Sequence, residues 1–294
     1  MSRTNSVPRI SVIVPVYNDP EGVRETLQSL IEQQNAPNYE IIVVNNDSTD
    51  ETPGVIEEFE EKYLDLVFGY LETEIQSSYA ARNAGIEHAS GELLAFIDAD
   101  VTVEETWTAD VHEAFQNTDV DYLGCNVEMH IPNRKDTVWA RYDVAMGLPV
   151  EHYLKSKQFA PTCALVVRRR VIKEVGVFDQ TLVSGGDKEL GKRVHNAGFQ
   201  MSFAPEITVQ HPARTSLESL LKKAMRIGRG QTQLWSRYNL AVHPLSLSRF
   251  LPPSPRRIKK RTQPSQNYLV IYIITYLLKL VQTVYSIQIF LKKS

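Results

Sequence analysis

The stretch Leu93-Leu94-Ala95-Phe96-Ile97-Asp98-Ala99-Asp100 places two carboxylates directly after a run of five apolar residues. A short apolar run of this kind is typical of a fully covered strand in a parallel sheet. In such sheets, ligands bind beyond the carboxyl ends of the strands. Two acids aimed at one point repel each other unless a cation joins them. The stretch therefore predicts a metal-assisted site for an anionic ligand.

The length and composition are those of an ordinary globular protein. With 294 residues, of which 43% are apolar and 23% charged, the chain can form one large domain or two smaller ones. The two cysteines, Cys125 and Cys163, are too few for a disulfide framework, and neither has a partner at metal-ligand spacing. The composition therefore indicates a reducing compartment.

The charge of the chain changes sign near residue 213. Residues 213–294 hold 15 of the 32 Lys and Arg residues but only one of the 35 Asp and Glu residues, Glu218. A basic tail beside an acidic body is typical of a nucleic-acid arm or a membrane-surface segment.

The segment 268–291 favours the membrane over nucleic acid, because it is almost entirely apolar. Its single charge, Lys279, costs about 2.5–3.5 kcal/mol near the centre of a span, so a tilted span, an in-plane interfacial helix and a soluble amphipathic helix all stay open. Basic residues flank it on both sides: Arg256, Arg257, Lys259, Lys260 and Arg261 before it, Lys292 and Lys293 after it. We expect no signal peptide, since the residues before the first strand are few and polar.

Strands and helices alternate along the first hundred residues. The apolar patterns predict strands at 10–15, 40–44, 66–70 and 93–97, and helices at 20–34, 52–63 and 79–89. This alternation predicts an α/β fold with a doubly wound, mostly parallel sheet. After residue 100 we expect helices at 106–115, 138–157 with an interruption at 147–149, 169–175 and 187–197, and strands at 122–130 and 164–167.

Five motifs occur in an order that points to one family. They are Ser11-Val12-Ile13-Val14-Pro15-Val16-Tyr17-Asn18, Val43-Val44-Asn45-Asn46-Asp47-Ser48-Thr49-Asp50, Ala81-Arg82-Asn83-Ala84-Gly85, Asp98-Ala99-Asp100 and Gly185-Gly186-Asp187-Lys188-Glu189-Leu190. Residues 8–231 thereby resemble the family 2 inverting glycosyltransferases, which have the Rossmann-like GT-A fold and bind nucleotide-sugars.

The resemblance implies a domain organisation. We expect a GT-A domain at 8–250, with a nucleotide-binding half at 8–100 and an acceptor and catalytic half at 101–231. A basic linker at 251–264 and a membrane-associated helical tail at 265–294 follow.

The resemblance also implies a metal site. Asp98 and Asp100 stand at the family's Asp-x-Asp motif, whose carboxylates hold a divalent cation against the donor diphosphate and contact the donor ribose. His211 resembles the histidine that completes the site in relatives, so Asp100 and His211 are the expected metal ligands. Carboxylate ligands suit Mg²⁺, and an imidazole favours Mn²⁺.

Asp187 aligns with the catalytic base of the family, which deprotonates the acceptor hydroxyl. Many relatives have Glu-Asp where this chain has Gly186-Asp187, so a single acid occupies the position. The first turn of a helix favours the ionised carboxylate and lowers its basicity, and neighbouring groups must set its working pKa.

Donor recognition is expected from residues after the first strands. Asn45 and Asn46 stand where many relatives have Asp-Asp next to the nucleobase. An amide accepts the uracil N3–H as a carboxylate does but also donates, so uridine is the first choice while guanosine and thymidine stay open. Arg82 resembles the arginine that reaches the base or the diphosphate, and Pro15 and Tyr17 would shape the nucleoside pocket.

These expectations combine into one hypothesis. The chain is a metal-dependent inverting glycosyltransferase of the hexosyltransferase type, held by its tail at the cytoplasmic face of the cell membrane. It passes a sugar from a nucleoside-diphosphate donor, a UDP-sugar first, to a lipid-linked, polysaccharide or other glycan acceptor in cell-envelope synthesis. We expect no nucleic-acid partner. The Gln-x-x-Arg-Trp motif of processive synthases is missing, since 226–231 reads Arg-Ile-Gly-Arg-Gly-Gln, which favours transfer of single sugars.

Two alternatives remain at this point. Asp98 and Asp100 also match the Asp-x-Asp nucleophile loop of haloacid-dehalogenase-type phosphatases, although that loop normally ends the first strand of its domain and here three strands precede it. The chain could also be a catalytically inactive, membrane-bound protein that binds nucleotide-sugars.

Overall fold

The computed structural model describes residues 8–116, 118–262 and 267–292. Residues 265, 266, 293 and 294 of the expected tail lie outside these ranges. The chain divides into two units, which we describe separately. The first comprises residues up to 128 with 149–181 and 190–211, and the second comprises 129–148, 182–189 and 212–294.

The first unit is built on an eight-stranded sheet with the order β3-β2-β1-β4-β7-β6-β8-β5 within the described ranges. Its strands are β1 (Ile10–Val16), β2 (Tyr39–Asn45), β3 (Val67–Leu71), β4 (Leu93–Phe96), β5 (Thr102–Val103), β6 (Tyr122–His130), β7 (Leu165–Arg168) and β8 (Met201–Pro212). This is the expected α/β sheet, and its predicted strands are confirmed within two residues at either end.

The direction of the strands changes in the middle of the sheet. β3, β2, β1 and β4 run parallel to their neighbours, as the alternating strands and helices predict. The pairs β4–β7, β7–β6 and β5–β8 are antiparallel. The expectation of a mostly parallel sheet therefore describes the N-terminal half, because after β4 the strict alternation that produces parallel neighbours is lost.

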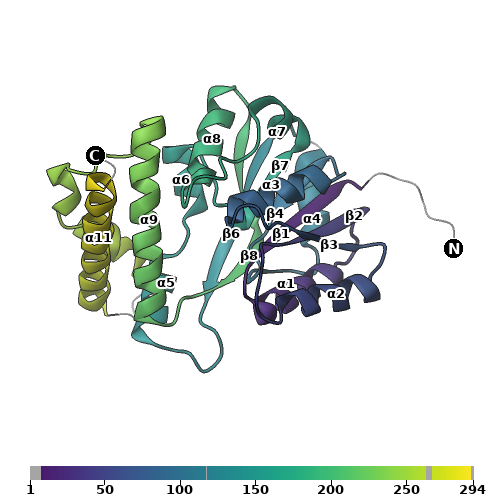
Figure 1. Ribbon diagram of the computed structural model, residues 1–294, viewed down its shortest axis with the longest axis horizontal. Coiled ribbons are helices and arrows are strands. Elements are labelled where there is room, and N and C mark those ends of the chain that lie inside the picture. Colours follow the sequence, from purple (N-terminus) through teal and green to yellow (C-terminus); the bar gives the residue numbers. More distant parts are fainter. Residues whose placement is uncertain (1–7, 117, 263–266, 293–294) are drawn as a thin grey trace. The chain divides into compact units, whose positions relative to one another are not determined.

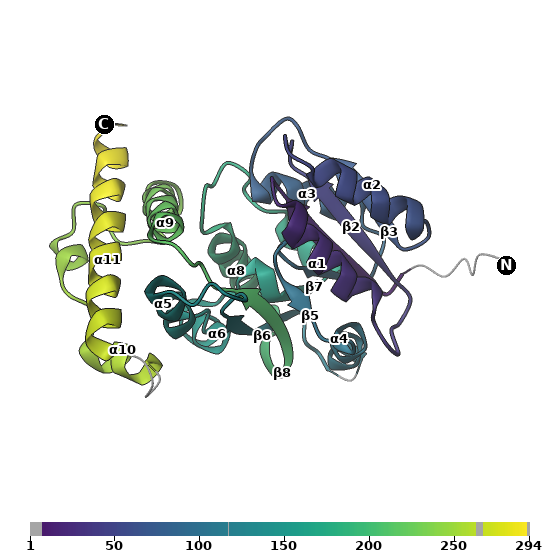
Figure 2. The same ribbon diagram turned by 90° about the horizontal axis from the view of Figure 1, so that it is seen from below.

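The helices follow the predicted positions. They are α1 (Pro20–Ile31), α2 (Thr52–Lys62), α3 (Ser78–His88), α4 (Trp107–Gln116), α5 (Val138–Met146), α6 (Val150–Lys157), α7 (Arg169–Val175) and α8 (Gly186–Asn196). Asp19 begins α1 by accepting the Gly22 N–H at 3.0 Å. Gly147, with a φ of 40°, ends α5 and confirms the predicted interruption. Figures 1 and 2 show α1 and α2 side by side.

The core of the first unit lies around β1, β2 and β4. Nearly every residue of these strands is buried, since a parallel sheet is covered on both faces. Ser11 of β1 is a buried polar residue in this core, and its hydroxyl donates to Glu40 Oε1 at 2.6 Å and accepts the Gly91 N–H at 2.8 Å. A buried polar group satisfied in this way does not oppose folding.

The second unit collects the C-terminal helices. α9 (Leu217–Tyr238), η2 (Leu247–Phe250), α10 (Pro255–Arg261) and α11 (Tyr268–Leu291) belong to it. The sequence analysis did not predict α9, and α10 lies inside the segment expected to be a linker. Its buried side chains form an apolar cluster that joins α5, α9, α10 and α11: Tyr142, Ala145, Leu220, Ala224, Ile258, Ile271, Ile274 and Leu278.

α11 lies beside α9 (Figure 1), and small and polar residues take part in their contact in addition to the apolar cluster. The hydroxyls of Thr232 and Ser286 lie 2.7 Å apart, and both residues are buried. Gly228 permits this approach, because a Cβ there would lie 2.6 Å from the Gln282 carbonyl oxygen. The opposite face of α11 is apolar and open to solvent, with Ile273 48% and Leu277 56% exposed.

α11 is long and apolar enough to cross a membrane, judged by length and composition. Buried residues make up 28% of its most apolar window. The helix therefore combines one face that packs within the second unit with another that is available to an apolar partner.

A pair of glycine variants tests the packing of α3 on the sheet. Gly85→Ala places a methyl group 2.5 Å from Ile13 Cγ2, so we expect the free energy of unfolding to fall by about 1–3 kcal/mol. The control Gly54→Ala, in α2, meets nothing within 4 Å and should gain up to about 1 kcal/mol. Chemical denaturation measures both. Equal stability of Gly85→Ala and the wild type would contradict the close approach.

Candidate functional site

The loops after β1 and β2 are joined at the carboxyl edge of the sheet. The Asn18 N–H donates to Ser48 Oγ at 2.9 Å, and Asn18 Oδ1 accepts the Thr49 N–H at 2.8 Å. Asn18 and Asp47 have φ angles of 50° and 63°, a left-handed conformation that Asn and Asp adopt more readily than most residues. Parallel strands end at the same edge, so these loops form one border of the candidate site.

Pro15 and Tyr17 sit where the sequence expected the nucleoside pocket. Pro15 is buried in β1, opposite Val44 of β2. Tyr17 directly follows the strand and is 48% exposed, so its ring is open to a ligand.

The side chains of Asn45 and Asn46 are engaged within the protein. Asn45 Oδ1 accepts the Ser48 N–H at 2.9 Å. Asn46 Nδ2 donates to the carbonyl oxygens of Glu72 and Ile75, at 3.0 and 2.9 Å. A carboxylate cannot donate these bonds. The amide group of Asn46 therefore has a structural use in this loop.

Arg82 of α3 forms an ion pair with Asp98. Its Nη2 lies 2.5 Å from Asp98 Oδ1, and its Nη1 donates to the Ser78 carbonyl oxygen at 3.1 Å. The Arg82 side chain is 5% exposed and that of Asp98 36%. A buried guanidinium needs a partner of opposite charge, so the pair holds the carboxylate at the end of β4. Arg82 Nε is buried without a hydrogen-bond partner among the described residues.

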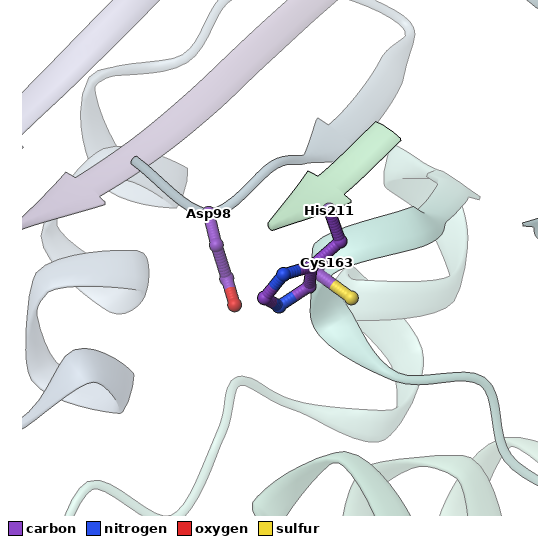
Figure 3. Close-up of side chains that lie close together, drawn as sticks. All are labelled: Asp98, Cys163 and His211. Carbon is purple, nitrogen blue, oxygen red and sulfur yellow. The ribbon is translucent and has the colours of Figure 1, made fainter. Parts of the chain in front are cut away.

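Asp98, Cys163 and His211 converge in the first unit. One ligand atom from each lies within 4.8 Å of the others (Figure 3). Asp98 is partly exposed, and the other two side chains are buried. Figure 3 shows the Asp98 carboxylate directed at the imidazole ring of His211, with the sulfur of Cys163 next to that ring.

The sheet register explains this convergence. Phe96 of β4 lies opposite Leu165 of β7 in the last pair of their ladder, so the turn that follows β4, with Asp98, lies close to η1 (Thr162–Ala164), which precedes β7 and holds Cys163. Thr102 of β5 lies opposite Gln210 of β8, so the next position sets Val101 opposite His211. The short turn from Asp98 to Val101 thus lies close to Cys163 at its start and to His211 at its end.

The three residues fit a divalent cation by their chemistry. Carboxylate, imidazole and thiol are all common metal ligands, with metal–ligand distances of about 2.0–2.3 Å. Ligand atoms around one tetrahedral ion lie about 3.3–3.8 Å apart, so side-chain movements of about 1 Å bring the three atoms to that spacing.

The predicted ligand His211 is in this cluster together with Asp98. Asp100 is in the following turn, is partly buried and is not one of the three residues. The sequence analysis missed Cys163, because its relation to Asp98 depends on an antiparallel pairing. The signal available was its position directly before the strand predicted at 164–167.

Asp187 belongs to the second unit and is described by itself. It lies in the first turn of α8, and its Oδ1 accepts the Lys188 N–H at 2.8 Å. Gly185 precedes the helix with a φ of 89°, a conformation that suits glycine. Burial lowers the pKa of Lys188, and the charge of Asp187 opposes that shift.

The sequence profile of "Glycosyl transferase family 2" matches residues 11–176. Glycosyltransferase AglE of Haloferax volcanii is 39% identical over 233 residues, which cover 79% of this chain and 76% of that protein. The putative glycosyltransferase EpsH of Bacillus subtilis is 34% identical over 152 residues, covering 51% of this chain and 42% of EpsH.

Two solved structures have a similar fold. A mannosyltransferase from Pyrobaculum calidifontis in complex with GDP-mannose and Mn²⁺ aligns with a TM-score of 0.65 at 17% identity, covering 99% of this chain and 89% of that one. TarS residues 1–349 from S. aureus, in complex with UDP-GlcNAc, aligns with a TM-score of 0.57 at 17% identity, covering 95% and 89%. The fold is therefore GT-A.

Asn45 and Asn46 provide a matched test of the hydrogen bonds in the loop after β2. Asn46→Asp sets a carboxylate against two carbonyl oxygens, so we expect the free energy of unfolding at neutral pH to fall by about 1–3 kcal/mol. The loss should shrink below about pH 4, where a protonated carboxyl donates once. In Asn45→Asp the acceptor for Ser48 is kept, and stability should stay near that of the wild type. Denaturation curves at both pH values measure the effects; equal losses in the two variants would contradict this assignment.

Proposed function

Because this chain belongs to glycosyl transferase family 2, and is thus a glycosyltransferase with a nucleotide-sugar donor, we propose that it is metal-dependent and inverting, of the hexosyltransferase type. The observation that carries this proposal is the convergence of Asp98 and His211 at the carboxyl edge of the sheet. Membership of this family argues against the alternative of a haloacid-dehalogenase-type phosphatase.

The metal site would comprise Asp98, Asp100 and His211. A divalent cation bound there supplies positive charge that neutralises the departing nucleoside diphosphate. The similar mannosyltransferase with GDP-mannose and Mn²⁺ supports a cation of this type. Arg82 orients Asp98 for that role by pairing with one of its oxygens.

The donor would lie along the loops after β1, β2 and β4. Tyr17 is the exposed ring at this edge, Pro15 shapes the strand below it, and Asn45 and Asn46 hold the adjoining loop. We keep uridine as the first choice of base, which the similarity to TarS with UDP-GlcNAc supports. The similarity to the mannosyltransferase with GDP-mannose keeps guanosine as an alternative base.

Asp187 would act as the base. It takes the proton of the acceptor hydroxyl while that oxygen attacks the anomeric carbon and the bond from carbon to the diphosphate oxygen breaks. A single displacement from the opposite side inverts the configuration at that carbon. The first turn of α8, where Asp187 lies, favours the carboxylate form, which is the form that accepts a proton.

The tail would hold the enzyme at the cytoplasmic face of the membrane. Exposed apolar residues of α11 and the basic residues of α10 fit a surface of anionic lipid, where each Lys or Arg contributes about 1 kcal/mol. A lipid-linked or polysaccharide acceptor in cell-envelope synthesis agrees with that position.

A nucleotide-sugar screen tests the proposed function. Thermal unfolding is measured with UDP-, GDP- and TDP-sugars, each with Mn²⁺ or with chelator. One donor should stabilise the chain only with the metal, by about 2.7 kcal/mol at 100 times its dissociation constant. Asp100→Ala should lose this stabilisation. Stabilisation that persists in chelator would refute metal dependence.

The base is tested by Asp187→Asn. Turnover should fall by roughly 10²–10⁴-fold, because the general base is lost, while metal-dependent donor affinity stays nearly unchanged. Glu57→Gln, an exposed acid of α2, is the control and should retain full turnover. Unchanged turnover in Asp187→Asn would remove this residue from the mechanism, and donor binding without transfer in the wild type would support an inactive binding protein.

Membrane association is tested on the exposed face of α11. Deleting the tail would also uncover Leu220 and Ala224 of α9, so point variants are sharper. Ile273→Lys with Leu277→Lys should reduce co-sedimentation with anionic vesicles. Leu64→Lys replaces an exposed leucine, 73% exposed, in the first unit and should leave it unchanged. Equal sedimentation of all three proteins would refute α11 as the anchor.

A further inference from the structure

Cys163 supplies the sulfur of a mixed ligand set. Its Sγ, one oxygen of Asp98 and one nitrogen of His211 lie within 4.8 Å of one another. The residues come from three segments: the turn after β4, η1 before β7, and the end of strand β8. Cys163 is 3% exposed and His211 6% exposed.

A buried cysteine is often only a small apolar side chain, and Cys125 illustrates that case. It lies in β6, is fully buried, and burial raises the pKa of its thiol to about 12. It is not part of the cluster of ligand atoms. Cys163 differs because the antiparallel register of β4 and β7 sets it against Asp98, with an imidazole beside both.

We propose that Cys163 is itself a ligand of the cation at this site, so that the chain binds thiophilic divalent ions such as Zn²⁺, Co²⁺ and Cd²⁺ in preference to Mg²⁺. This rests on the proposed metal site and goes beyond it by naming a ligand and a metal class. Mg²⁺ prefers oxygen ligands, whereas sulfur and imidazole suit Zn²⁺. The thiol releases its proton to solvent as the metal–sulfur bond forms.

The site is open to solvent on the side of Asp98, because Cys163 and His211 are buried. Asp98 is its most exposed member, with 36% of the side chain open, so an ion enters past this carboxylate. Arg82 occupies Asp98 Oδ1, and a carboxylate accepts bonds through its other oxygen as well. Arg82 thereby orients the ligand without competing for both oxygens. Zn²⁺ held in this way competes with Mn²⁺ for the same place.

Cobalt spectroscopy on the full chain tests the proposal. Co²⁺ added to metal-free protein should produce a thiolate-to-cobalt charge-transfer band in the near ultraviolet. Cys163→Ser should abolish the band, and the matched variant Cys125→Ser should retain it. Calorimetry should give a Zn²⁺ affinity at least roughly tenfold lower in Cys163→Ser than in Cys125→Ser, with a smaller change for Mn²⁺.

Contrary results separate this inference from the proposed function. A band that survives in Cys163→Ser, or Co²⁺ binding without a band in the wild type, overturns ligation by Cys163. If Mn²⁺-dependent nucleotide-sugar binding persists in that case, the proposed function stands; if it is absent too, the metal site as a whole is wrong. Should the serine variant not fold, ¹¹³Cd resonance of the wild type decides, because a shift typical of oxygen and nitrogen ligands alone contradicts the proposal.

Discussion

The ion pair between Arg82 and Asp98 is the interaction on which the candidate site depends. The guanidinium is almost fully buried and would be destabilising without a negative partner. The partner is the Asp98 carboxylate just after β4, so the need to pair a buried charge also fixes the position of this proposed ligand. α3 can carry Arg82 to this place because Gly85, one turn further on, lets the helix lie directly on β1.

The change of strand direction beside β4 provides the rest of the constellation. If the strand beside β4 ran parallel to it, that strand would end at the same edge of the sheet. The residues next to Asp98 would then come from the loop after that strand. The antiparallel β7 instead begins opposite the end of β4, so Cys163 meets Asp98. The link from β4 to β5, which pairs with β8, brings His211 to the same point. A carboxylate, a thiol and an imidazole therefore meet where these strand pairings and the turns next to them come together.

Residues governed by local pattern were predictable from the sequence. The apolar runs of β1, β2 and β4 and the break at Gly147 are confirmed, because burial and glycine conformation act over a few residues. Long-range pairing was not predictable in this way. Nothing local to Cys163 reveals which strand it faces. α9 is a different case: its apolar residues recur at helical spacing and Ser216 caps its first turn, so the local pattern was sufficient to predict it. Asn46 was expected at the nucleobase, while its partners, the carbonyls of Glu72 and Ile75, lie in a loop without a marked pattern.

Under the proposed function, Asp98 and His211 hold a divalent cation for the donor diphosphate. The most direct measurement is a crystal structure of the chain with Mn²⁺ and a nucleoside diphosphate, with anomalous scattering recorded at the manganese edge. We expect one strong anomalous peak next to the diphosphate, within bonding distance of His211 and of a carboxylate of Asp98 or Asp100. A diphosphate bound at this edge of the sheet with the anomalous peak elsewhere, or with none, would contradict it.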